Sequence, residues 1–168
     1  VVCDNAQVYG KAVVCGNAHV CEDAEISDNA SVYGDAEVYD NAKVYDHAWV
    51  HGMARVFGDA KVYGDARVFD YSKVFGNAEA YSGAQICGNA EICGNAKVQS
   101  NEDYAVFKNF WRSGFWLTWT RSNDMWKEGL FYGTGNKLVK KAYLDEENGK
   151  NYEIIVNAVK QISNGKEI

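Results

Sequence analysis

Several side chains in the second half of the chain could together bind an anion. Arg121 and Lys127 supply positive charge, and the run Gly133-Thr134-Gly135 opens a helical pattern. A glycine-rich turn at a helix start leaves backbone amides free for a phosphate or a nucleotide, and nearby basic side chains add charge. The turn lacks the full spacing of a phosphate-binding loop, so helix capping beside solvated charges is the competing interpretation.

A second group of candidate residues combines aromatic, apolar and basic side chains. Patches of this composition are typical of protein interfaces. We therefore predict a docking surface here, for another subunit or for the C-terminal half of the chain, with drift in a tolerant repeat as the alternative. The group consists of two runs that lie 18 residues apart, Trp49, His51 and Met53 followed by Arg67, Phe69 and Tyr71.

The elements that must position these residues follow a six-residue repeat from Val2 to Val98. Val or Ile occupies 16 of the 17 aliphatic positions, and Ala occupies 15 of the 16 positions that precede the next unit. A period of six fits neither a helix nor a single alternating strand. It indicates a coil with flat sides, in which Gly, Asn and Asp make the corners and β-branched side chains point inward.

Units such as Gly16-Asn17-Ala18 and Gly58-Asp59-Ala60, each followed two residues later by Val, resemble those of the hexapeptide-repeat family. The resemblance implies a left-handed parallel β-helix with three hexapeptides, or 18 residues, per coil. Residues 1–99 would then form about five coils of an all-β solenoid.

The same resemblance raises the question of catalysis, because many members of the family transfer acyl groups with a His general base in a trimer. His51 and His19 are the weak catalytic candidates that it implies here. Neither lies on an inserted loop, and the three histidines of the chain are too far apart in the repeat to converge on a metal ion. We therefore predict no catalytic residue, no metal site and no cofactor.

An 18-residue coil would stack outward-facing residues into columns. Such columns stabilise a parallel sheet by ring stacking and, more weakly, by solvated ion pairs. The predicted ring columns are Tyr39, Phe57, Phe75 and Tyr45, Tyr63, Tyr81, and the predicted charge pairs are Glu37 with Arg55, Lys73 with Glu91, and Glu79 with Lys97.

Residues 100–168 lack the repeat and read as a separate α+β module. Three antiparallel strands are predicted at Tyr104–Trp111, Phe115–Arg121 and Met125–Tyr132, joined by short turns. Two helices are predicted at Lys137–Asn148 and Tyr152–Ile162, with Gly149 ending the first. The module holds 12 of the 23 aromatic residues, so one sheet face can pack on the helices while the other needs the solenoid, a partner or a ligand.

Composition excludes several classes of protein. The five Cys are odd in number and form no CxxC pair, which predicts neither a disulfide framework nor a zinc ribbon and favours a reduced, cytoplasmic setting. Residues 1–99 carry 14 acidic and 7 basic side chains, so direct nucleic-acid binding there is disfavoured. No apolar run is long enough to span a bilayer, so no membrane partner is expected.

These observations favour a non-enzymatic binding or assembly protein. In this reading a rigid solenoid displays the α+β module, a homo-oligomer (trimer or dimer) covers exposed aromatics, and the partner is a protein or an anionic small molecule. Near-consensus repeats of this type look like those of bacterial and phage proteins. A specific form of the hypothesis is therefore a bacterial or phage-encoded inhibitor, or a protein that sequesters a small ligand or a nucleotide. The alternatives are a hexapeptide-type acyltransferase and an acidic nucleic-acid mimic.

Overall fold

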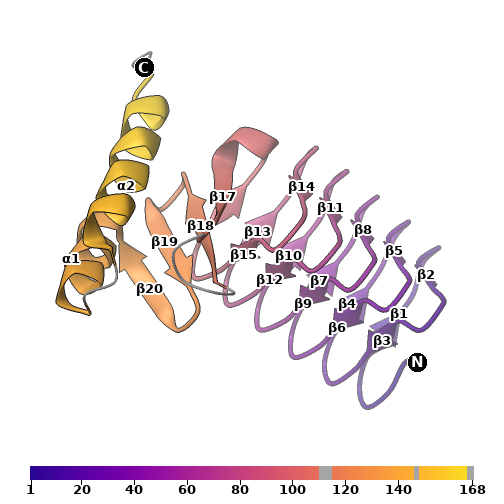
Figure 1. Cartoon of the computed structure of the whole chain (residues 1–168). Helices are drawn as coiled ribbons and strands as arrows, with labels where there is room; N and C mark the ends of the chain where they lie inside the picture. Colours follow the sequence, from indigo (N-terminus) through magenta and orange to yellow (C-terminus); the bar gives the residue numbers. More distant parts are fainter. Residues whose placement is uncertain (110–114, 146–147, 166–168) are drawn as a thin grey trace.

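The computed structural model describes residues 1–109, 115–145 and 148–165, and it contains a parallel β-solenoid of about five turns followed by an α+β module. Figure 1 shows the coils stacked from the N-terminus toward the module. The solenoid is built from two-residue strands at six-residue intervals: Gln7–Val8 (β1), Val13–Val14 (β2), His19–Val20 (β3), Glu25–Ile26 (β4), Ser31–Val32 (β5), Glu37–Val38 (β6), Lys43–Val44 (β7), Trp49–Val50 (β8), Arg55–Val56 (β9), Lys61–Val62 (β10), Arg67–Val68 (β11), Lys73–Val74 (β12), Glu79–Ala80 (β13), Gln85–Ile86 (β14), Glu91–Ile92 (β15) and Lys97–Val98 (β16).

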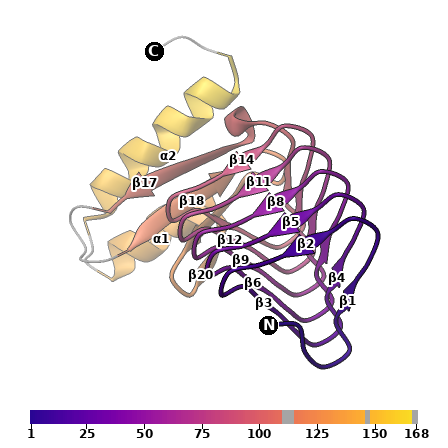
Figure 2. The same cartoon turned by 90° about the vertical axis from the view of Figure 1, so that its right-hand side faces the viewer.

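Each strand pairs in parallel with the strands three before and three after it in the chain, which produces three flat sheets. The sheet orders are β1-β4-β7-β10-β13-β16, β14-β11-β8-β5-β2 and β15-β12-β9-β6-β3. Paired residues are 18 apart in sequence, as in Trp49 opposite Arg67. The predicted coil length is therefore confirmed, and Figure 2 shows the coils from the N-terminal side, stacked behind one another.

The interior of the solenoid explains the strict repeat. The inward Val, Ile and Ala side chains from Ala18 to Val98 are fully buried. Corner residues such as Gly34 and Asp46 adopt positive φ angles, which favours Gly, Asp and Asn. Where Asp takes this place its carboxylate accepts a hydrogen bond from the next corner, as Asp46 does from the Gly64 amide at 3.1 Å.

The module has four antiparallel strands rather than the predicted three, in the order β17-β18-β19-β20. The predicted strand Met125–Tyr132 is divided by a tight turn in which Gly129 has a φ of 51°. The elements are a short 3-10 helix at Asn101–Asp103, β17 (Tyr104–Lys108), β18 (Trp116–Thr120), β19 (Met125–Glu128), β20 (Phe131–Thr134), α1 (Gly135–Leu144) and α2 (Gly149–Ser163).

Two further boundaries differ from the prediction. Gly149 begins α2 instead of ending the first helix, because Asn148 makes the turn in a left-handed conformation. A Cβ atom at Gly149 would lie 2.4 Å from the Tyr143 ring, so only Gly fits there. The predicted strand end at residues 110–111, the turn at 112–114 and the helix residues 146–147 lie outside the described residues.

The module's sheet is packed on both faces. One face, with Leu117, Trp119 and Trp126, shares a core with both helices. The opposite face covers the last coil of the solenoid (Figure 1), where Tyr104 and Val106 pack against the solenoid core. The sequence predicted that the solenoid, a partner or a ligand would cover this face, and in the structure the solenoid covers it.

Side chains of the module also cap the hydrogen-bonding edge of the last coil. In the coil before it, the Lys73 amide donates to the Ala90 carbonyl at 2.8 Å. The Glu91 amide, one coil further on, donates instead to Thr118 Oγ1 at 3.0 Å. The two equivalent amides of the same coil, on Gln85 and Lys97, donate to Asn101 Oδ1 at 2.9 Å and Ser122 Oγ at 2.7 Å. The module thus replaces a further coil and removes an open β-edge.

The first coils contain a disulfide bond, which the sequence analysis did not predict. Cys3 and Cys21 are 18 residues apart, so they lie in register on consecutive coils with their Cα atoms 4.8 Å apart. That separation is within the range for a disulfide. The odd number of Cys obscured this, because Cys15, Cys87 and Cys93 are free.

Candidate functional site

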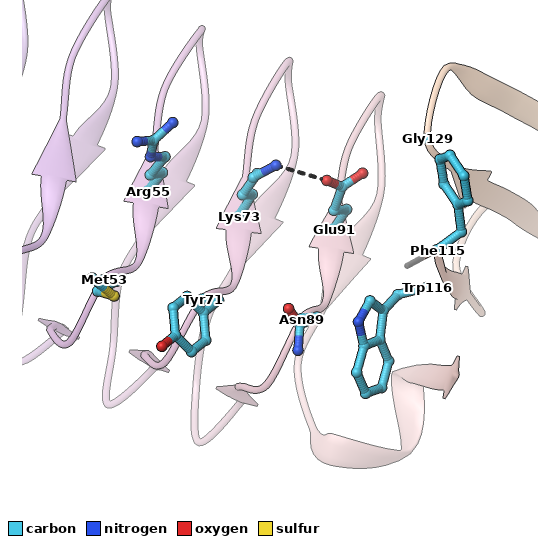
Figure 3. A pocket seen from close by; sticks show the side chains of 9 residues that line it. All are labelled: Met53, Arg55, Tyr71, Lys73, Asn89, Glu91, Phe115, Trp116 and Gly129. Atoms are coloured by element: carbon cyan, nitrogen blue, oxygen red, sulfur yellow. Dashed lines mark hydrogen bonds and ion pairs between the residues drawn. The ribbon is translucent and has the colours of Figure 1, made fainter. Parts of the chain in front are cut away.

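A cleft of about 540 Å³ lies where one corner of the solenoid meets the module (Figure 3). Solenoid side chains form two parallel rows that run toward the module. The start of β18 and the turn between β19 and β20 close the end. The described residues that line the cleft are Met53, Arg55, Tyr71, Lys73, Asn89, Glu91, Phe115, Trp116 and Gly129.

The first row lies along a corner of the solenoid. Met53, Tyr71 and Asn89 occupy the same corner position in three consecutive coils, and Trp116 extends the row (Figure 3). Met53 is 51% exposed and Tyr71 is 60% exposed, although both replace the Asn or Asp that is usual there. This row therefore offers apolar and aromatic surface to solvent.

The second row carries charge from strands β9, β12 and β15. Arg55 Nε lies 3.0 Å from Glu37 Oε2, and Lys73 Nζ lies 2.9 Å from Glu91 Oε1. Lys127 of the module reaches the other oxygen of Glu91 at 3.1 Å. Three cations therefore share two carboxylates, an excess of one positive charge among these five side chains.

Glu91 remains a carboxylate in this arrangement. Burial alone would raise its pKa, but the hydrogen bonds and charges of Lys73 and Lys127 outweigh burial and lower the pKa. Lys108 adds a further positive charge, with Nζ 5.7 Å from the centre of the Trp116 ring. The end of the cleft thus combines rings with cations, which suits a ligand that has a flat ring and an anionic group.

The predicted docking surface is divided between this cleft and a neighbouring face. Met53 and Tyr71 line the cleft. Trp49 and Arg67 lie on β8 and β11, where the Arg67 guanidinium stacks 4.8 Å from the Trp49 ring centre. The other two members, His51 and Phe69, stack on each other with ring centres 5.2 Å apart.

The predicted ring and charge columns also form. Phe57 stacks between Tyr39 and Phe75 at 5.0 and 4.8 Å, and Tyr63 stacks between Tyr45 and Tyr81 at 5.0 and 5.3 Å. The three predicted charge pairs lie within ion-pair distance.

The predicted anion-binding residues lie on both sides of the module's sheet. Lys127 faces the solenoid and pairs with Glu91, whereas Gly135 packs against α2, where a Cβ atom would lie 2.6 Å from Val156. Gly133 is buried against the Phe131 ring, and Thr134 is the N-cap of α1 without a capping hydrogen bond from its side chain. Arg121 is exposed beside Trp119 in a groove along α2.

The two candidate catalytic histidines lie elsewhere on the solenoid. His51 is held between the rings of Tyr33 and Phe69, and burial lowers its pKa, with a smaller contribution from Arg67 that Asp70 opposes. His19 is exposed on β3, opposite Glu37. Neither belongs to the described residues that line the cleft.

Among the described residues, the potential metal ligands Cys3, Asp4 and Cys21 lie close together. Since the two sulfur atoms are joined in the disulfide, they are not available as thiolate ligands.

Sequence reasoning missed most of the cleft. Arg55, Lys73 and Glu91 were treated only as solvated pairs, although their 18-residue spacing already placed them in one row beside Met53 and Tyr71. Trp116 carried no such signal, because it joins the site through packing between two parts of the chain with different periodicities.

Comparison of the chain with protein-family models, with curated proteins and with solved structures found no match. The protein is therefore characterised by its fold and its cleft. It is a parallel β-solenoid capped by an α+β module, with an aromatic and basic cleft at the junction. Neither of its two helices, within the described residues, has the length and apolar character needed to cross a bilayer.

Proposed function

We propose that this chain is a non-enzymatic binding protein whose ligand occupies the cleft between the solenoid and the module. The ligand class is a small anion that carries a planar ring, for which a nucleotide is the test case. The observation that supports the proposal is the pairing of exposed rings with a local excess of cations in one cleft of about 540 Å³. That volume is within the usual range for small-molecule sites.

The rings provide the first part of the argument. Trp116 and the exposed Tyr71 lie in the same row, on either side of Asn89 (Figure 3). Stacking of a base on an aromatic side chain contributes about 1–3 kcal/mol. Because Tyr71 lies on a coil of the solenoid and Trp116 lies on β18, the backbone does not need to rearrange to present the two rings, which limits the entropy cost of binding.

The charges provide the second part. Lys73 and Arg55 line the cleft and are only partly covered, with side chains 39% and 48% exposed. Glu91 forms ion pairs with both Lys73 and Lys127, so an incoming anion competes with this single carboxylate for two lysines. An anionic group bound to Lys73 and Arg55 would bring its ring to the Tyr71 and Trp116 end.

The test is calorimetric titration of the protein with adenosine monophosphate, adenosine and ribose 5-phosphate. We expect adenosine monophosphate to bind more tightly than either fragment. Trp116→Ala should weaken binding by about tenfold, the loss expected for one stacked base. Lys61→Met, on the separate sheet that contains β10, is the matched control and should not change binding. Absence of binding, or equal binding by Trp116→Ala, would count against the proposal.

The predicted homo-oligomer belongs to the same proposal, as a second copy that covers the Trp49 and Arg67 face. Trp49 is 39% exposed, and its stacking with Arg67 makes an aromatic and basic surface of the kind that interfaces use. Sedimentation velocity should show a dimer or trimer for the native chain and a monomer for Trp49→Ala. Ser31→Ala, one coil earlier on the same sheet, is the control. A monomeric native chain would contradict this part.

A further inference from the structure

A second cavity lies on the other side of Phe115 and belongs entirely to the module. Its volume is about 250 Å³. Phe115, Leu130 and Phe131 make its walls apolar, and Glu128 and Lys141 are the two charged residues among the described residues that line it. The cavity is therefore a small apolar pocket with a carboxylate in its wall.

Glu128 belongs to a buried polar cluster. It is only 6% exposed, and its neighbours Asn109 and Tyr152 are 2% and 1% exposed. Asn109 Nδ2 and the Tyr152 hydroxyl each donate to Glu128 Oε1 at 2.8 Å. Asn109 Nδ2 also donates to the Tyr152 hydroxyl oxygen at 2.7 Å.

The cluster contains more acceptors than donors. Asn109 Oδ1 is buried and accepts no hydrogen bond from the described residues, and both donated bonds reach the same oxygen of Glu128. An unsatisfied buried acceptor costs about 1–3 kcal/mol, so such a group calls for an explanation. The missing partner is a hydrogen-bond donor.

The carboxylate of Glu128 also lacks a counterion within the described part of the chain. Lys141, the cation at the rim of the cavity, has its Nζ 2.5 Å from Asp145 Oδ2. The ion pairs formed by described residues do not include Glu128. Burial of a carboxylate without a cation is costly, and a bound cation would remove that cost.

We propose that this cavity binds a free small primary amine with an apolar stem. Its ammonium group would pair with Glu128, the member of the cluster that lines the cavity, while the stem would fill the space between Phe115, Leu130 and Phe131. An ammonium group has three donors and no acceptor, which matches a site rich in acceptors. The cavity is smaller than the roughly 300–1,000 Å³ of drug-sized sites, which favours a ligand of about one ring.

A purely structural role for the cluster makes a different prediction. In that case Glu128 would only link β19 to α2 through Tyr152, and it would show no preference for a charged ligand. The probes are 2-phenylethylamine, its neutral isostere 2-phenylethanol, and the anion 3-phenylpropionate. These share the ring and differ in the group that would reach Glu128.

Titrations followed by NMR should show binding of 2-phenylethylamine. 2-Phenylethanol should bind at least about tenfold more weakly, because it cannot form an ion pair with the buried carboxylate. The anion should bind more weakly still, because the carboxylate repels it. Glu128→Gln should remove the preference for the amine over the alcohol. Glu153→Gln, which alters an exposed carboxylate of α2 that accepts a bond from Tyr143, is the matched control.

Equal affinity for the amine and the alcohol in the native chain would overturn the proposal, and this comparison remains decisive if Glu128→Gln fails to fold. A preference for the amine that survives in Glu128→Gln would overturn it as well. A lysine-containing tripeptide tests whether the ammonium comes from a partner protein. Binding of that peptide without binding of 2-phenylethylamine would contradict a free amine as the ligand.

Discussion

At the residue scale, the last coil of the solenoid depends on three side-chain acceptors from outside the repeat. Thr118 is the most buried of them, at 2% exposure, and its hydroxyl oxygen accepts the Glu91 amide hydrogen. In an uncapped solenoid this amide would have no partner. The junction of solenoid and module is therefore stabilised by hydrogen bonds to backbone amides of the last coil as well as by apolar packing.

Replacement of this acceptor tests the capping role. Thr118→Val keeps the shape of the side chain but leaves the Glu91 amide unpaired, which should reduce the free energy of unfolding by about 1–3 kcal/mol. Urea denaturation gives the value. Thr134→Val is the control, since the Thr134 hydroxyl makes no capping bond and its loss should have little effect. Equal losses for the two variants would contradict the capping role.

His51 gives a prediction for the dependence of stability on pH. Burial between two rings lowers its pKa in the folded state, below the usual value of 6.5. The unfolded chain then binds the proton more readily, so the stabilising contribution of neutral His51 is complete above pH 6.5 and is lost as the pH falls through the folded-state pKa. His51→Phe should remove this loss, as measured by urea midpoints at neutral and at acidic pH. An NMR titration that places the His51 pKa at or above 6.5 would contradict this account.

At the element scale, the run Gly133-Thr134-Gly135 spans the junction between the end of β20 and the start of α1 and permits close packing. Gly135 is buried, and a Cβ atom there would lie 2.6 Å from Val156 and 3.1 Å from the Trp126 indole nitrogen. Gly135→Ala should therefore overpack the module core and reduce the free energy of unfolding by about 1–3 kcal/mol. Gly83→Ala is the control, because no atom lies within 4 Å of the added carbon. Thermal melting of the two variants checks this, and an unaffected Gly135→Ala would favour a role outside packing.

The period of the repeat was sufficient to predict the solenoid. Every coil has the same limited space in its interior, so the same positions must hold Val or Ile and Ala in each coil. The 18-residue register also explains the Cys3–Cys21 bond, which could have been found by the same reasoning. The module was harder to predict, since Gly129 was not recognised as a turn and a strand was counted once instead of twice. The cleft could not be predicted as a whole, because Trp116 joins Tyr71 and Asn89 in lining it only through tertiary packing.

At the scale of the whole molecule, charge is distributed unevenly. The solenoid is acidic, yet Arg55, Lys73 and Lys127 converge beside the cleft where the module is attached. The rigid coils hold the two rows of side chains at a fixed spacing, and the module closes the end of both rows (Figure 3). Binding at this junction therefore depends on both parts of the chain, although each part has its own core.

The most direct test of the cleft is a map of the amide and indole NMR signals during titration with adenosine monophosphate. The proposed function predicts saturable shifts at Tyr71, Lys73 and the Trp116 indole, with His19 and Lys61 on other parts of the solenoid unaffected. Shifts confined to other surfaces, or no shifts at all, would contradict binding of a ring-bearing anion at the junction of the solenoid and the module.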